Sequence, residues 1–184
     1  MKIIKKECVF HGTYLRIVNK HFRNGKGQEG IWESIERKNI YNKGAVAVVA
    51  ITKEKELILE RNWRFPLESF VIQLPAGLTD KKGEGEEEAA RRELLEETGY
   101  LAGKLIPVIS TPSCSSLIPT IVTHFFAPDV EFSGITMRDT AEKIEILKVP
   151  IKEVDDFFLN LPEDTELDLG VLGILRIMEK KNFF

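Results

Sequence analysis

The sequence of 184 residues predicts an α/β (α+β) protein in which a mixed sheet is flanked by helices. Strand-like segments fill about half of the first 74 residues, one charged helix follows them, and two further helices close the chain. Residues 45–51 (AVAVVAI) are almost all β-branched or small, which is typical of a strand buried on both faces. We therefore expect one domain over residues 43–184, preceded by a small β extension over residues 1–42.

The N-terminal extension is predicted to hold three strands. Glu7–Phe10 and Tyr14–Asn19 flank the turn at residues 11–13 as a hairpin, and Gly30–Arg37 follows a loop rich in Asn and Gly. In the main domain, short apolar segments between polar turns predict these strands: Ala45–Ile51, Glu56–Arg61, Phe70–Leu74, Lys104–Ile109, Thr120–Ala127 and Glu142–Val149.

Three helices are predicted. The first begins at Glu84 and ends before Gly99, a residue suited to the left-handed conformation that follows many helices. The second covers Ile151–Leu159 and the third about Thr165–Lys180. The third presents a broad apolar stripe to a core, formed by Leu169, Leu172, Ile174, Leu175, Ile177 and Met178.

The composition is that of an ordinary globular protein, with 43% hydrophobic and 30% charged residues. A net charge of −3 gives no reason to expect nucleic acid or an anionic membrane as the main partner. No apolar run approaches the roughly 18 residues of a membrane-spanning helix, and the first residues do not resemble a signal peptide. Cys8 and Cys114 are too few for a disulfide framework. We therefore expect a cytoplasmic protein.

The densest chemical signal is a group of carboxylates near the end of the first helix. At about 100° per residue, Glu93, Glu96 and Glu97 fall within an arc of about 100°. Like charges four residues apart destabilise a helix, so Glu93 and Glu97 need a compensating cation. Hard divalent ions such as Mg²⁺ bind oxygen ligands and keep substrate phosphates in their shell. The alternative is a solvated acidic face. Such a face would be held by the pairs Glu87–Arg91, Glu88–Arg92 and Arg92–Glu96.

The segment that surrounds these carboxylates is residues 74–100, LPAGLTDKKGEGEEEAARRELLEETGY. It resembles the Nudix box, G-x5-E-x7-R-E-U-x-E-E-x-G-U, in which U is a bulky aliphatic or aromatic residue. Six residues rather than five separate Gly77 from Glu84, and one extra residue in a turn costs little closure entropy. Every specified position from there onwards matches: Glu84, Arg92, Glu93, Leu94, Glu96, Glu97, Gly99 and Tyr100. The resemblance implies the Nudix-type α/β/α sandwich with a mixed sheet.

The same resemblance implies a metal-dependent hydrolase of pyrophosphate bonds. Glu93, Glu96 and Glu97, together with the backbone carbonyl of Ala76, are implied as ligands of Mg²⁺, with Mn²⁺ as the alternative ion. Such ions neutralise phosphate oxygens and lower the pKa of a bound water. The acidic patch is therefore interpreted as the centre of the reaction.

Arg92, Glu96 and Glu142 form the implied catalytic set. Arg92 is implied to pair with Glu84 or Glu96 and to orient the metal ligands from outside the first coordination sphere. Glu142 occupies the loop before a late strand that supplies the general base in relatives. The competing interpretation is that Glu142 is a solvent-exposed loop carboxylate.

Two segments outside the box, WESIER at residues 32–37 and NWRFP at residues 62–66, resemble the ADP-ribose pyrophosphatase branch of the family. Trp32 is implied to stack on adenine, and Glu33 to accept a hydrogen bond from the adenine amino group. Arg37 and Arg64 are implied to bind the diphosphate or ribose. Two alternatives stay open: Trp32 as a core or dimer-interface side chain, and Arg37 in a surface ion pair. Trp63 is expected to pack.

Members of this branch are homodimers whose N-terminal strands build part of the partner's site, so residues 1–42 are expected to serve dimerisation and substrate contact. The implied reaction is Mg²⁺-dependent hydrolysis of ADP-ribose to AMP and ribose 5-phosphate. One alternative is another small-molecule nucleoside diphosphate sugar, such as GDP-mannose. The other is a catalytically silent nucleotide-binding module; such modules tend to lose the box carboxylates that this chain keeps.

Overall fold

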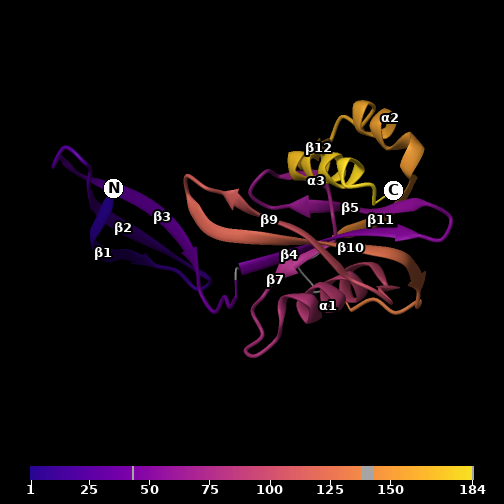
Figure 1. Cartoon of the computed structure of the whole chain (residues 1–184), viewed down its shortest axis with the longest axis horizontal. Helices are drawn as coiled ribbons and strands as arrows, with labels where there is room; N and C mark the ends of the chain where they lie inside the picture. Colours follow the sequence, from indigo (N-terminus) through magenta and orange to yellow (C-terminus); the bar gives the residue numbers. More distant parts are fainter. Residues whose placement is uncertain (43, 138–142, 184) are drawn as a thin grey trace.

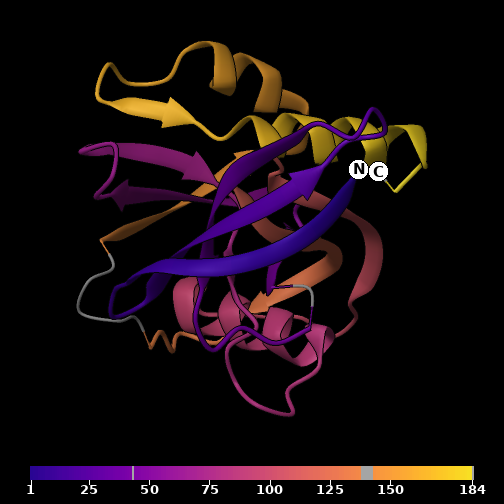
Figure 2. The same cartoon turned by 90° about the vertical axis from the view of Figure 1, so that its left-hand side faces the viewer.

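The structure is a computed structural model that describes residues 1–42, 44–137 and 143–183. At the N-terminus, the strands β1 (Lys2–His11), β2 (Leu15–Arg23) and β3 (Glu29–Arg37) form an antiparallel sheet in that order. This sheet projects from one end of the main domain (Figure 1) and lies across that end when viewed from the side (Figure 2). The predicted β extension is therefore present.

In the part of the chain that the structure describes, the main domain is built on a nine-stranded mixed sheet with the path β12-β6-β5-β4-β10-β8. Off this path, β11 pairs with β5, β7 with β4 and β9 with β10; the β10–β4 and β12–β6 pairs are parallel. The bounds are β4 (Gly44–Thr52), β5 (Glu56–Arg64), β6 (Ser69–Gln73), β7 (Ala76–Leu78), β8 (Tyr100–Leu101), β9 (Ile106–Cys114), β10 (Ile118–Phe132), β11 (Ile144–Pro150) and β12 (Thr165–Leu167).

Helices cover both faces of this sheet, which makes the domain an α/β/α sandwich. Helix α1 (Glu86–Thr98) lies on one face, and α2 (Val154–Leu159), preceded by the 3₁₀ turn η1 (Ile151–Glu153), and α3 (Leu169–Lys180) lie on the other (Figure 1). Each face has its own hydrophobic core. This arrangement confirms the fold class that the sequence predicts.

The central strand β4 contributes alternate side chains to the two cores, because successive residues of a strand point to opposite faces. Three of its residues face the core beneath α1, and three others face the core beneath α2 and α3. The first set is Val46, Val48 and Ala50, and the second is Ala47, Val49 and Ile51. The prediction that residues 45–51 form a strand buried on both faces is confirmed.

Helix α1 begins two residues later than the predicted start at Glu84. Gly85 is extended, with φ −75° and ψ 161°, and its backbone N–H donates to Glu88 Oε2 at 2.8 Å. The predicted end is confirmed, because Gly99 adopts the left-handed conformation with φ 77° and its N–H donates to Leu95 O.

The predicted start of the last helix at Thr165 is wrong. Residues 165–167 form β12, which pairs in parallel with β6. Asp168 then begins the helix by accepting a hydrogen bond from Gly170 N at 2.8 Å. The pairing of β12 with a distant strand outweighs the local apolar pattern that favoured a longer helix.

The N-terminal sheet meets the main domain at the β9–β10 hairpin. Ile35 N donates to Leu117 O at 2.9 Å, and Trp32 Nε1 donates to Ser116 O at 2.8 Å. Every residue of β1 is exposed. None of the helices in the described ranges has the length and apolar character that a bilayer span requires.

Candidate active site

The acidic end of α1 lies against the short strand β7, and two contacts hold it there. Ala76 N donates to Glu97 Oε2 at 3.0 Å. The carboxyl group of Glu93 occupies the space beside Gly77, where an added Cβ would lie 1.9 Å from Glu93 Cδ. The Ala-Gly sequence of β7 therefore provides both a backbone donor for one carboxylate and room for the other.

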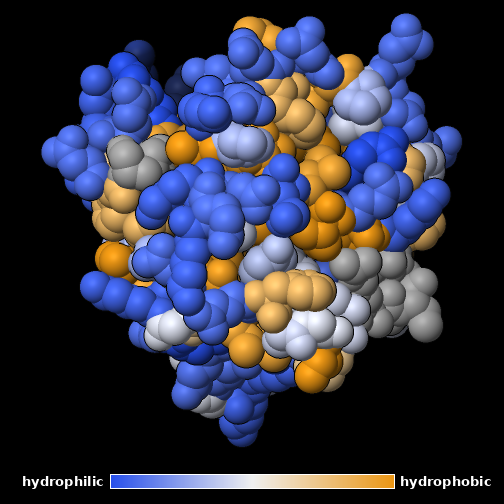
Figure 3. Space-filling model, turned by 90° about the vertical axis from the view of Figure 1, so that its right-hand side faces the viewer, coloured by the Kyte–Doolittle hydropathy of each residue, from blue (hydrophilic) through white to orange (hydrophobic). Residues whose placement is uncertain are grey.

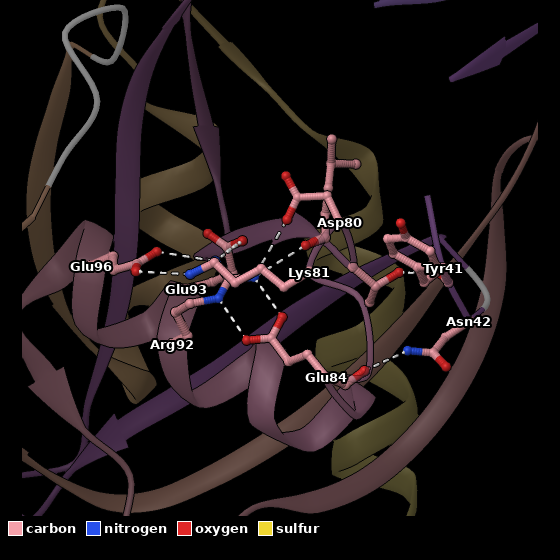
Figure 4. Close-up of polar contacts among 10 residues, drawn as sticks. Tyr41, Asn42, Asp80, Lys81, Glu84, Arg92, Glu93 and Glu96 are labelled. Atoms are coloured by element: carbon pink, nitrogen blue, oxygen red, sulfur yellow. Dashed lines mark hydrogen bonds and ion pairs between the residues drawn. The ribbon is translucent and has the colours of Figure 1, made fainter. Parts of the chain in front are cut away.

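Arg92 lies at the centre of the remaining carboxylates (Figure 4). Its Nε donates to Glu84 Oε1 at 2.8 Å, and its Nη1 donates to Glu93 Oε1 at 2.7 Å and Glu96 Oε2 at 3.0 Å. The sequence predicts a pairing with Glu84 or Glu96, and the structure contains both. The side chain of Arg92 is only 16% exposed, and its hydrogen bond to Glu84 raises the pKa of the guanidinium further above its usual range.

The loop between Gly77 and Glu84 accommodates its extra residue through contacts with the segment before β4 (Figure 4). Tyr41 N donates to Thr79 O at 2.8 Å, and Asn42 Nδ2 donates to Glu84 O at 2.9 Å. Glu84 still reaches Arg92. The departure from the usual box spacing therefore leaves the arginine-carboxylate cluster intact.

Burial and mutual repulsion disfavour the charged forms of the carboxylates that face β7. Desolvation raises the pKa of Glu93, although Arg92 opposes this shift. Burial, and then the neighbouring carboxyl groups of Glu60 and Glu93, raise the pKa of Glu97 to about 10. An added cation beside Glu93 and Glu97 would stabilise their ionised forms.

A pocket of about 470 Å³ opens beside these carboxylates. It brings together five of the residues selected from the sequence. They are Arg37 at the end of β3, Arg64 at the end of β5, Ala76 on β7, and Glu93 and Glu97 on α1. Glu96 is not among the lining residues; it is held by Arg92 and lies 3.6 Å from Lys81 Nζ.

The predicted adenine-binding residues Trp32 and Glu33 do not line this pocket. Both are exposed on β3, and Trp32 is 53% exposed. The interpretation of Trp32 as a core side chain is therefore wrong, whereas Trp63 packs on Phe70 with ring centroids 5.2 Å apart, as expected. Glu142 lies outside the described residues, so its predicted role remains a prediction.

Buried polar residues that the sequence did not predict as part of the site lie close to the pocket, among them Glu60 on β5 and Gln73 on β6. Glu60 is 0% exposed and Gln73 is 5% exposed. The strand periodicity held a signal for Glu60, since Ile58, Glu60 and Asn62 share one face of β5 and Ile58 belongs to the core beneath α1. A glutamate at such a position is rare unless it has a polar partner.

The donor set of the pocket fits a hard divalent cation. Within the described ranges, no three acidic, histidine or cysteine side chains are already gathered around one point. Nevertheless, Glu93 and Glu97 line the same pocket as Ala76, so two carboxyl groups meet there beside the backbone of β7. Oxygen ligands beside a space large enough for a phosphate are what Mg²⁺ prefers.

The fold is an α/β/α sandwich, and its candidate site is an acidic helix beside an Ala-Gly strand. Together these two features define the class of protein. Comparisons identify the family: a model of the NUDIX domain matches residues 42–167. The chain is 32% identical over 169 residues to ADP-ribose pyrophosphatase of Bacillus subtilis (strain 168), covering 90% of this chain and 85% of that protein. The chain therefore belongs to the Nudix family of pyrophosphohydrolases.

Two further comparisons agree with this assignment. The chain is 30% identical over 168 residues to ADP-ribose pyrophosphatase of Saccharomyces cerevisiae, covering 83% of this chain and 71% of that protein. A solved structure described as an ADP compounds hydrolase has the same fold, with a TM-score of 0.81 over 98% of this chain and 92% of that chain. Its sequence identity is 23%.

Gly77→Ala is expected to lower the rate of pyrophosphate hydrolysis at least tenfold. The new Cβ would overlap the carboxyl group of Glu93, which must then leave its place beside β7. Steady-state kinetics and thermal unfolding of the variant would measure the effect. Gly103→Ala is the control, because nothing lies within 4 Å of the Cβ added there. Equal rates for the two variants would contradict the proposed placement of Glu93.

Proposed function

We propose that the protein hydrolyses the pyrophosphate bond of ADP-ribose in a Mg²⁺-dependent reaction that yields AMP and ribose 5-phosphate. The observation that carries the proposal is the single pocket that Arg37 and Arg64 share with Glu93 and Glu97. Guanidinium groups match phosphate oxygens, and carboxylates match the cation that accompanies a diphosphate. The choice of ADP-ribose is supported by the names of two relatives that the chain matches over most of its length.

The proposed cation ligands are Glu93, Glu96, Glu97 and the carbonyl of Ala76. When bound, Mg²⁺ or Mn²⁺ supplies neutralisation of the phosphate oxygens and acidifies the attacking water. The role of Arg92 is to hold Glu93 and Glu96 in fixed orientations through hydrogen bonds of 2.7 and 3.0 Å. Glu96 does not line the pocket, and its carboxylate lies 3.0 Å from Arg92 Nη1 and 3.6 Å from Lys81 Nζ; its place in the proposed ligand set rests on the match to the Nudix box.

Arg64 and Arg37 are proposed to bind the diphosphate in the pocket that the carboxylates also line. Arg64 is fixed by its Nε, which donates to Gln73 Oε1 at 2.8 Å. This contact orients the planar guanidinium before substrate arrives, which reduces the entropy lost on binding. Glu142 remains the proposed acceptor of the proton from the attacking water.

Trp32 and Glu33 are proposed to bind adenine in the site of a second protomer of a homodimer. Both side chains are exposed, and neither lines the pocket of its own protomer. The N-terminal sheet also exposes several large apolar side chains: Ile3, Ile4, Val9, Phe10 and Ile31. The opposite end of the molecule mixes hydrophilic and hydrophobic patches (Figure 3). Apolar side chains gathered on a projecting sheet favour an interface there.

A substrate panel would test the proposed activity. With Mg²⁺ present, ADP-ribose is expected to give the highest kcat/KM among ADP-ribose, GDP-mannose and other nucleoside diphosphate sugars. Trp32→Ala is expected to raise the KM for ADP-ribose about tenfold, because base stacking on an aromatic ring contributes about 1–3 kcal/mol. Faster turnover of GDP-mannose would reject ADP-ribose as the substrate, and an unchanged KM would reject the role of Trp32.

A further inference from the structure

Glu60 is a carboxylate that neither the Nudix box nor the flanking motifs contain. It lies on the central part of β5, is 0% exposed, and pairs in register with Gln73 on β6. Gln73 Nε2 donates to Glu60 Oε2 at 3.2 Å. Burying a carboxyl group is costly unless it is paired and hydrogen-bonded, so its position demands an explanation.

The neighbours of Glu60 connect it to both halves of the proposed site. On one side, its carboxyl group is a close neighbour of the Glu97 carboxyl group and raises the pKa of Glu97, whose Oε2 accepts from Ala76 N at 3.0 Å. On the other side, Gln73 presents its amide oxygen to Arg64 Nε at 2.8 Å. Gln73 and Glu60 thus connect Arg64 to Glu97, both of which line the pocket.

We propose that Glu60 is a positioning residue that holds the Glu97 carboxylate where it receives a divalent cation and adds negative charge behind it. Gln73 fixes Glu60 and links it to Arg64, the proposed diphosphate ligand. This inference rests on the proposed function, because it takes Glu97 as a cation ligand. Carboxylates that bind metals are commonly held by outer hydrogen-bonding partners, and loss of such a partner costs about 10–100-fold in metal affinity.

A purely structural role for Glu60 would be to join β5 to β6 through Gln73. A neutral glutamine could make that contact without the cost of burying a carboxyl group beside a second one. The structure instead places Glu60 beside Glu97, which lines the pocket together with Glu93. A divalent cation in the pocket would compensate this concentration of negative charge.

Binding of Mn²⁺ by calorimetry, without nucleotide and at one fixed pH, tests the inference. Glu60→Gln is expected to weaken Mn²⁺ binding about 10–100-fold relative to wild type. Glu56→Gln is the matched control, because it removes the same charge from the far end of β5, where Glu56 pairs with Lys148 at 3.3 Å. The control is expected to bind Mn²⁺ like wild type.

Gln73→Met provides a second variant that keeps Glu60 and removes the amide that fixes it. It is expected to weaken Mn²⁺ binding in the same direction, and it decides the matter if Glu60→Gln does not fold. Wild-type affinity in a folded Glu60→Gln, or in Gln73→Met if Glu60→Gln is lost, would overturn the role of Glu60. Absence of Mn²⁺ binding by wild type would instead reject Glu97 as a cation ligand, and with it the proposed metal centre.

Discussion

Glu97→Gln is expected to lower kcat about a thousandfold or more while leaving the metal-free protein at least as stable as wild type. An amide cannot replace a carboxylate as a strong ligand of Mg²⁺, and metal-assisted charge stabilisation contributes several kcal/mol to such reactions. Since each 1.36 kcal/mol is a factor of ten in rate, a loss of about 4 kcal/mol gives this magnitude. Single-turnover kinetics with saturating substrate and Mg²⁺ would measure it.

The pH dependence of stability gives a second measurement on the same variant. In the folded, metal-free protein the pKa of Glu97 rises from 4.5 to about 10, so its contribution to stability is fully present below pH 4.5 and is lost as the pH rises towards 10. Glutamine does not ionise, so its own contribution to stability does not change with pH. Urea unfolding in the presence of EDTA should therefore show the stability of Glu97→Gln, relative to wild type, increasing between pH 5 and pH 9.

Glu87→Gln is the control for both measurements. Glu87 lies on the same helix and pairs with Arg91 at 2.8 Å on the exposed face, where an ion pair contributes little. We expect Glu87→Gln to have a kcat and a pH dependence of stability close to those of wild type. A Glu97→Gln protein that retains more than a tenth of the wild-type kcat would exclude Glu97 from the metal centre.

The parts of the site that the sequence predicted depend on local geometry. Glu93 and Glu97 lie about one turn apart on a helix, so their common position beside the pocket follows from the helical repeat, whereas Glu96 does not line the pocket. Gly99 ends the helix through its own backbone conformation. The burial of β4 on both faces follows from its composition, because a run of β-branched and small apolar residues is typical of a strand covered on both sides.

The parts that sequence reasoning missed depend on contacts between distant segments. Glu60 and Gln73 meet only because β5 and β6 pair in a particular register, which no short pattern encodes. The strand β12 exists only because β6 offers it an edge. Trp32 needs the β9–β10 hairpin to fix its position through Ser116 O. Pairing between distant segments thus determines the positions of these residues, which local propensity does not predict.

Arg92→Met is expected to lower the free energy of unfolding by about 2–3 kcal/mol and to reduce kcat as well. Breaking a buried ion pair by removing one partner costs about 3–5 kcal/mol, and the 16% exposure of Arg92 places the value at or below the low end. Without the guanidinium, Glu84, Glu93 and Glu96 lose the cation that all three contact. Urea unfolding at neutral pH would measure the loss.

Arg91→Met separates this effect from the loss of any arginine on α1. Arg91 is more exposed and pairs with Glu87 alone among the described carboxylates, so its removal is expected to cost less than about 1 kcal/mol. Added Mg²⁺ should restore part of the stability of Arg92→Met, because a ligand that binds only the folded state stabilises it. Equal losses for the two variants, with no response to Mg²⁺, would show that Arg92 does not organise the metal-binding carboxylates.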